Sequence, residues 1–325
     1  MKVDKRSFVG IDISKDTFNA HWENCDKKYS NDRKGWNMLL REAPVNSVIT
    51  MEATGNYHYR LAAYAKQKGY DVKVFNPYKV RSFIKSLPGH KSKTDKTDAR
   101  SIYRFATNDE SRNLPFFELM SPKLVRARVI VSLLNRMTVL KTACGNANKS
   151  HGLVIGKADD LLGVMSGLAD VCGDYQAQLE KEMCSLARYL YPEHFRLLQT
   201  ITGIGAKTAA VLLVSVKDLN SFETSGCLSS FVGLVSRHYE SGTSLNVNGS
   251  IVKGGNAYLR SLLFSCTKSA IQHNKPCSDL YHRLRAKGTL HMVATVAVMH
   301  KLVKIAWGVA KSGEPFRNGK KLALS

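Results

Sequence analysis

Short apolar runs alternate with amphipathic ones over the first hundred residues of the chain. The mostly β-branched run Phe8–Ser14 predicts a buried strand, and Trp36, Leu39 and Leu40 recur at helical spacing within Arg33–Ala43. The same patterns predict strands at Thr17–Trp22, Lys27–Ser30, Ser47–Gly55 and Asp71–Phe75, and helices at Tyr57–Lys68 and from Pro77 onward. Three meandering strands followed by alternating helices and strands are typical of an α/β domain.

Two of these predicted strands carry a carboxylate. Asp12 lies in the middle of the first strand, where a carboxylate is costly unless it is paired or binds a metal, and Glu52 closes the fourth strand before a glycine turn. The order of elements predicts a ribonuclease-H-like plan over residues 1–118, with the strand of Asp12 central and that of Glu52 beside it. For Asp12 alone, a hydrogen-bonded turn residue is an equal interpretation.

The segment Lys93–Arg100 predicts a helix with two more carboxylates, Asp95 and Asp98, on one face. A solvated salt-bridge helix has the same pattern, but the two strand carboxylates favour a shared site. Four converging carboxylates would hold Mg²⁺ or Mn²⁺ through oxygen ligands, and paired metals assist phosphoryl transfer. The cations Lys93, Lys96 and Arg100 are predicted phosphate contacts.

Beyond Ser121 the pattern becomes helical. Apolar residues recur at helical spacing in two long runs, separated by a stretch richer in Gly and Asp at His151–Asp174. The first run contains Leu124, Val125, Ile130, Leu133, Leu134, Met137 and Leu140, and the second contains Leu179, Met183, Leu186, Leu190 and Leu197. Two long helices over 119–196 are the economical interpretation, either as an arm that joins subunits or as an ordinary helical subdomain.

The remaining residues, 197–325, contain a predicted helix-hairpin-helix at Leu198–Leu212. Gly203 and Gly205 would expose backbone N–H groups at a helix N-terminus, which suits a phosphate, and Lys207 adds a positive charge. A tight helical turn without a ligand is the alternative.

A predicted loop at Phe231–Ser244 is rich in hydroxyl groups. Ser236, Tyr239, Ser241, Thr243 and Ser244 are all candidate nucleophiles toward phosphorus, and a hydroxyl needs a base or a metal for activation. For any one of them, a turn hydroxyl bonded to the backbone is the commoner role. The cations predicted to contact phosphate here are Arg237, His238, Lys253 and Arg260.

The composition indicates that the binding partner is a polyanion. Lys and Arg number 48 against 26 Asp and Glu, a net charge of +22, and nucleic acid is the commonest polyanion that such a field attracts. Acidic residues inside the basic stretch Pro77–Arg100 would repel phosphate in a simple DNA clamp. They are explained if a bound cation inverts the local charge.

The sequence disfavours several other classes of protein. Seven scattered cysteines without a C-x-x-C pair argue against a structural zinc site and a disulfide scaffold. The apolar segment Met292–Ala310 carries His300, Lys301 and Lys304, so we expect a buried helix and no membrane partner. With no signal peptide pattern, we expect a cytoplasmic protein associated with the nucleoid of a bacterium or archaeon.

Five motifs in order give the chain a family resemblance. They are Gly10-Ile11-Asp12-Ile13-Ser14-Lys15, Met51-Glu52-Ala53-Thr54-Gly55, Lys93-Thr94-Asp95-Lys96-Thr97-Asp98-Ala99-Arg100, Ile204-Gly205 with Lys207-Thr208, and Tyr239-Glu240-Ser241-Gly242. Together they resemble the DEDD-type insertion-sequence transposases, which are relatives of pilin-gene inversion recombinases and of bridge-RNA-guided recombinases.

The resemblance implies a ribonuclease-H/resolvase-like N-terminal domain, a helical coiled-coil arm and a mostly helical C-terminal transposase domain. By motif it implies Asp12, Glu52, Asp95 and Asp98 as catalytic metal ligands and Ser241 as the nucleophile. It also implies donor and target DNA, a noncoding guide RNA and a homo-oligomer whose active site combines subunits. Two rival interpretations are a metal-dependent structure-specific endonuclease or junction resolvase, and a non-enzymatic nucleic-acid-binding protein.

Overall fold

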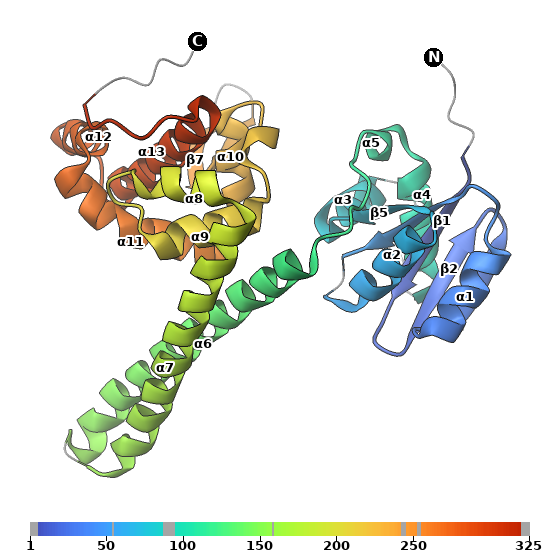
Figure 1. Cartoon of the computed structure of the whole chain (residues 1–325), viewed down its shortest axis with the longest axis horizontal. Helices are drawn as coiled ribbons and strands as arrows, with labels where there is room; N and C mark the ends of the chain where they lie inside the picture. Colours follow the sequence, from blue (N-terminus) through green and yellow to red (C-terminus); the bar gives the residue numbers. More distant parts are fainter. Residues whose placement is uncertain are drawn as a thin grey trace. The chain divides into compact units, whose positions relative to one another are not determined.

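The computed structural model describes residues 6–53, 55–86, 95–157, 159–241, 245–251 and 255–319, and only the backbone of 95–97, 110, 236–241 and 245–250. The chain divides into two compact units, Met1–Met120 and Ser121–Ser325, coloured blue to green and green to red in Figure 1. Each unit is described by itself below.

The first unit contains a five-stranded mixed sheet. Its strands are β1 (Phe8–Ile13), β2 (Thr17–Trp22), β3 (Cys25–Ser30), β4 (Val48–Glu52) and β5 (Asp71–Phe75), in the spatial order β3-β2-β1-β4-β5. The first three strands pair antiparallel, whereas β4 runs parallel to both β1 and β5. This order is consistent with the predicted ribonuclease-H-like plan, and it puts the strand of Asp12 at the centre of the sheet.

Helices cover both faces of this sheet (Figure 1). On one face, α1 (Arg33–Glu42) and α2 (Tyr57–Gln67) pack on a core that includes Val9, Ile11 and Met51. On the other face, apolar residues of α3 (Pro77–Ser86) and α4 (Asp95–Thr107) pack around Phe75. A short helix, α5 (Asp109–Arg112), follows α4.

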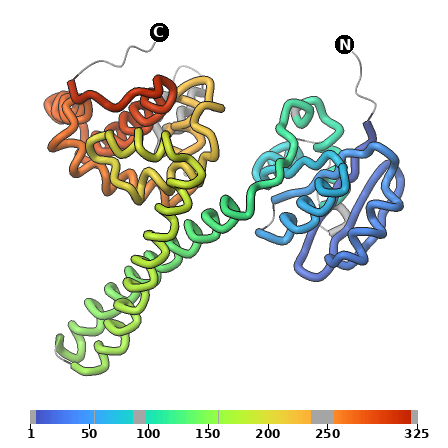
Figure 2. The backbone as a smooth tube through the Cα atoms, viewed as in Figure 1, coloured from blue at the N-terminus to red at the C-terminus, as the bar shows by residue number. Residues whose placement is uncertain are grey.

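Two long helices open the second unit. They form an antiparallel hairpin of α6 (Pro122–Ile155) and α7 (Leu161–Leu190), which Figure 2 traces in green. The prediction of two long helices is confirmed, but the break between them is much shorter than the Gly- and Asp-rich stretch indicated. Gly163 and Gly167 lie within α7, where surrounding helix formers and contact with α6 override the glycine signal.

The body of the second unit is mostly helical. It consists of α8 (Pro192–Gln199), α9 (Ala206–Val216), a 3-10 turn at Leu219–Ser221, α10 (Ser225–Val232), α11 (Ala257–His273), α12 (Lys275–Ala286) and α13 (His291–Ser312). Helix α13 alone among the described helices is long and apolar enough to cross a membrane, but 56% of that stretch is buried inside the unit. It packs against α10, α11 and α12, as expected of a core helix.

A two-stranded hairpin interrupts these helices. β6 (Ser236–Ser241) pairs antiparallel with β7 (Leu245–Ile251), and Ser241 lies opposite Leu245 at the end of β6. The prediction of a loop over Phe231–Ser244 was therefore wrong for Ser236–Ser241. Alternation of polar and bulky residues on a two-stranded ribbon gives little hydrophobic signal, because no second layer need cover it.

Candidate active site

Asp12 and Glu52 lie side by side on the sheet. The parallel pairing of β1 and β4 sets Gly10 opposite Thr50 and Ile11 opposite Met51, so that the next position on each strand is a carboxylate. Side chains alternate along a strand, and the buried Ile11 and Met51 face the α1/α2 core. Asp12 and Glu52, both half-buried, therefore face the side that α3 and α4 cover.

Helix α4 crosses this face close to β1. A Cβ added at Gly10 would lie 2.4 Å from the Ala99 carbonyl oxygen and 2.4 Å from the Tyr103 amide nitrogen. Phe8, two residues earlier on β1, packs with Ile102 and Phe105. Because later strand positions meet earlier helix positions, α4 runs antiparallel to β1.

The direction of α4 determines where its own carboxylates lie. Its first turn, which carries Asp95 and Asp98, is the end nearest to Asp12. Asp98 is half-buried, and the backbone of Asp95 begins the helix, while its side chain lies outside the described part. The described backbone therefore brings the segments of all four predicted metal ligands to one region of the sheet.

The chemistry of this region suits a hard divalent cation. Carboxylate oxygens are the ligands that Mg²⁺ and Mn²⁺ take, and two of the carboxylates lie level on adjacent strands. Among the side chains that the structure describes, no group of three His, Cys, Asp or Glu residues is close enough to hold a metal. Asp12, Glu52 and Asp98 are all described, so these three carboxylates are not gathered closely enough to hold a metal in this structure, and the metal site stays a prediction.

Arg100 is engaged inside the protein. Its Nε donates to the two carboxylate oxygens of Asp26 at 3.1 and 3.2 Å, and its Nη2 makes a further short contact with the same group. The Arg100 guanidinium lowers the pKa of Asp26 to about 2. Asp26 also contacts Nδ1 of His21 at 2.8 Å, and His21 packs edge-on against Tyr103 of α4.

This network changes the role expected for Arg100. A guanidinium that already makes a bidentate pair ties α4 to the β2–β3 hairpin and is less available to phosphate. The sequence gives no signal for the pair, because 74 residues separate its members. Of the other two predicted contacts, Lys93 lies outside the described residues and Lys96 is described only by its place in α4.

The predicted helix-hairpin-helix corresponds to α8, a turn and α9. Gly205 is the N-cap residue of α9, it is exposed, and a Cβ there would meet nothing within 4 Å. Gly203 has a φ of +104°, and a Cβ there would lie 2.9 Å from the Cβ of Ala270. Gly203 is thus required by packing against α11, whereas Gly205 leaves a helix N-terminus open.

Lys207 points toward the hairpin of α6 and α7, which we call the arm. Its Nζ forms a short ion pair with Glu180 of α7, and it lies 5.8 Å from the ring centre of Tyr258. Burial alone would lower the pKa of Lys207, but the Glu180 carboxylate and the Tyr258 hydroxyl together outweigh burial and raise that pKa. The pair joins α9 to the arm, and it gives no support to a phosphate contact by Lys207.

The residues around the predicted nucleophile are only partly described. The backbones of Arg237, His238 and Ser241 form β6, and Lys253 lies outside the described residues. Arg260 is half-buried on α11 and donates from Nη1 to the Val232 carbonyl at 3.2 Å. These roles therefore stay predictions.

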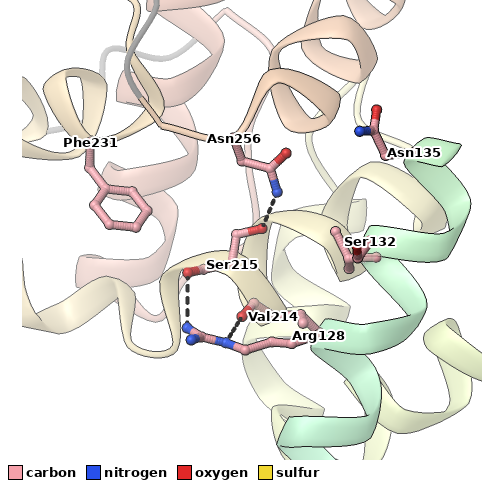
Figure 3. Close-up of a pocket in the computed structure, with 8 residues that line it drawn as sticks. Arg128, Ser132, Asn135, Val214, Ser215, Phe231 and Asn256 are labelled. Atoms are coloured by element: carbon pink, nitrogen blue, oxygen red, sulfur yellow. Dashed lines mark hydrogen bonds between the residues drawn. The ribbon is translucent and has the colours of Figure 1, made fainter. Parts of the chain in front are cut away.

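A pocket that the sequence did not indicate lies at the base of the arm (Figure 3). Its volume is about 530 Å³, and it is lined by Arg128, Val131, Ser132, Asn135, Val214, Ser215, Phe231 and Asn256. Arg128 donates to the Val214 and Ser215 carbonyls at 3.3 Å, and Asn256 donates to Ser215 Oγ at 3.2 Å. The two Arg128 bonds cap carbonyls in the last turn of α9. The lining comes from separate helices, so no motif marks it.

Two family descriptions match separate parts of the chain. The DEDD transposase family of IS110 matches residues 9–123, and the family described as Transposase IS116/IS110/IS902 matches residues 195–283. The first region contains Asp12, Glu52, Asp95 and Asp98, and the second contains the last part of α8, all of α9 and Ser241.

The chain is also similar to full-length relatives. The pilin gene-inverting protein of Moraxella bovis is 29% identical over 96% of this chain and 98% of its own length. The transposase for insertion sequence element IS1328 of Yersinia enterocolitica is 26% identical over 95% and 98%, and that for IS1111A of Coxiella burnetii is 25% identical over 96% and 91%. The chain belongs to the IS110 family of transposases, which are DNA recombination enzymes.

Proposed function

We propose that this chain is the transposase of an insertion sequence, which cuts DNA and rejoins it through a phosphoserine intermediate. The observation that carries the proposal is the register of the parallel strands β1 and β4, which places Asp12 and Glu52 next to each other. The first turn of α4 lies at the same end of β1. Carboxylates that converge there on a metal would be suited to phosphoryl transfer, in which positioning and charge compensation make the largest contributions.

Asp12, Glu52, Asp95 and Asp98 would hold Mg²⁺ or Mn²⁺ in a ribonuclease-H-like first domain. A divalent cation there supplies positive charge that offsets the charge of the scissile phosphate. The carboxylates face the α4 side of the sheet, and the buried residues on the other face keep their strands in register. A fixed position of the carboxylates is what metal-dependent catalysis requires.

Ser241 is the proposed nucleophile. Its Oγ would attack the scissile phosphorus, a new Oγ–P bond would form, and the bond to the departing deoxyribose oxygen would break. The phosphodiester is thereby kept in a covalent link and can be passed to a new partner strand. The similarity to a protein named for inverting a gene favours this route, because inversion requires rejoined ends and hydrolysis leaves free ends.

DNA is the proposed substrate, and a noncoding RNA is proposed as guide on the strength of the family resemblance alone. The net charge of +22 supports binding to polyanions of either kind.

A homo-oligomer joined through the arm is also proposed. Support comes from apolar side chains near the arm's tip: Leu153, Val154, Leu161 and Val164 are exposed by 81%, 83%, 67% and 69%. Exposed apolar residues that gather in this way are typical of an interaction surface.

Cleavage of DNA that carries both ends of the element tests the first part of the proposal. With Mg²⁺, wild-type protein is expected to cut the DNA, and Asp12→Asn and Glu52→Gln are each expected to reduce cutting by at least about a hundredfold, because each removes a charged ligand. Val45→Glu, an exposed position on the same unit, is the matched control. Full cutting by Asp12→Asn would rule out both the transposase and the alternative metal-dependent nuclease.

A further inference from the structure

The edge of the sheet beside Glu52 carries a surface that the carboxylates do not use. Phe75 of β5 lies level with Glu52, and the Ala53 amide donates to the Phe75 carbonyl at 3.0 Å. Helix α3 begins two residues later, at Pro77. The first turn of α3 therefore lies at the sheet edge where β4 delivers Glu52, which is the edge where α/β sheets bind ligands.

A groove of about 340 Å³ runs along α3 from this turn. It is lined by Tyr78, Lys79, Ser82, Phe83, Ser86 and Phe105, and we call it the Tyr78 groove. The rings of Phe83 and Phe105 pack 5.4 Å apart between centroids. Tyr78 is 79% exposed, although its backbone is fixed by a 2.9 Å hydrogen bond from its amide to the Asn76 side chain. The groove thus combines an aromatic lining with an exposed ring held on a helix.

The charge on α3 points to the kind of ligand. The helix carries Lys79, Arg81 and Lys85 and has no acidic residue. A lone exposed tyrosine is ordinary on a protein surface. An exposed ring beside a basic, hydroxyl-lined groove instead matches single-stranded nucleic acid sites, in which bases stack on aromatic rings and cations follow the backbone.

We propose that the Tyr78 groove binds an unpaired nucleobase of the DNA strand next to the scissile phosphate. Tyr78 stacks on the base, and Lys79 contacts a neighbouring phosphate. The base must be unpaired, because a duplex base is already stacked between its neighbours, and exchange of strands requires such unpairing. This assignment rests on the proposed phosphoryl transfer at Asp12 and Glu52, and it names the part of the substrate held beside them.

The test uses the full-length protein and a single-stranded DNA oligonucleotide with one 2-aminopurine, without divalent metal so that no strand is cut. We expect wild-type protein to quench the aminopurine by stacking. Tyr78→Phe keeps the ring and should bind within about twofold of wild type, whereas Tyr78→Ala should bind roughly 5- to 100-fold more weakly. Tyr175→Ala, which removes a 56% exposed tyrosine from α7, is the matched control and should bind like wild type.

Salt dependence separates the two contacts. Lys79→Gln should lower the slope of log affinity against log salt by about one, whereas Tyr78→Ala should leave that slope unchanged. Tyr78→Ala binding and quenching like wild type, or Tyr78→Phe losing as much as Tyr78→Ala, would overturn the proposal. Quenching of an RNA oligonucleotide but not of the DNA one would overturn the assignment to the cleaved strand.

One variant keeps this inference distinct from the proposed function. Asp98→Asn is expected to abolish cutting in Mg²⁺ while it still quenches the aminopurine. If Asp98→Asn cuts DNA at the wild-type rate, the proposed metal site fails. If Asp98→Asn loses cutting as expected and Tyr78→Ala still quenches fully, the base-binding assignment alone fails.

Discussion

At the scale of single residues, Gly10 determines how close α4 can come to the carboxylates. A side chain at residue 10 would occupy the space of the Ala99 carbonyl and the Tyr103 amide, both of which are helix backbone and cannot rotate away. The approach of the helix also brings its first turn to the strand end that carries Asp12. The glycine is thus a condition for the predicted site, although it donates no ligand.

We predict that Gly10→Ala destabilises the first unit by about 1–3 kcal/mol, because the extra methyl group overpacks a closed contact. Urea unfolding followed by tryptophan fluorescence measures this, since Trp22 and Trp36 lie in that unit. Gly163→Ala on α7 is the control. Nothing lies within 4 Å of its added Cβ, so the gain in helix propensity should stabilise the second unit by up to about 1 kcal/mol. Equal destabilisation by both variants would contradict this account.

At the scale of elements, α4 is held from two sides. Its apolar face packs on Phe75 and Phe8, and its polar face is tied to β3 through Arg100 and Asp26. Packing alone permits small rotations of a helix about its axis, whereas a bidentate ion pair holds the helix in one orientation. We therefore expect the ion pair to position the α4 carboxylates.

The Asp26–Arg100 pair predicts a dependence on pH. The folded-state pKa of Asp26, about 2, lies below the unfolded value near 3.9, so its stabilising effect is present above about pH 4 and is lost as the pH falls toward 2. Asp26→Asn should flatten this part of the curve of unfolding free energy against pH, measured from pH 5 to pH 2. Asp109→Asn, which removes a carboxylate 86% exposed, is the control, and an equal change in both variants would refute the assignment.

Local sequence patterns were informative about elements where one face is buried. The strands at Thr17–Trp22 and Asp71–Phe75 have the predicted bounds, because turn residues flank them. The break in the arm and the strand β6 were mispredicted, since helix contacts outweighed glycine in α7 and a short two-stranded hairpin gives little hydrophobic signal in the sequence.

Local patterns could also place Asp12 and Glu52 on neighbouring strands. They could not reveal that Arg100 and Lys207 are paired with Asp26 and Glu180, because those partners are distant in sequence.

At the scale of the whole molecule, the chain joins a unit with the predicted metal ligands to a unit with the proposed serine nucleophile and a long arm. The two are separate compact bodies within one chain. Exposed apolar residues near the arm's tip and the excess of positive charge both need partners, and a second copy and nucleic acid are the proposed ones.

We predict that Val154→Glu combined with Val164→Glu reduces the oligomer formed in solution, because two charges would be buried in an apolar contact. Sedimentation velocity at several concentrations measures the change. Val45→Glu, at a position exposed by 88% on the first unit, should leave the oligomer intact. An unchanged sedimentation coefficient in the double variant would exclude this face of the arm as the subunit contact.

The proposed transposase reaction depends most on a covalent bond between Ser241 and DNA. The most direct measurement incubates end-labelled DNA carrying both element ends with protein and Mg²⁺, then separates the products on a denaturing gel. We predict a protein–DNA adduct with wild type and with Tyr239→Phe, a neighbouring hydroxyl on β6, and neither adduct nor cut DNA with Ser241→Ala. Cutting that survives in Ser241→Ala, with no adduct, would contradict the claim and identify a hydrolytic nuclease.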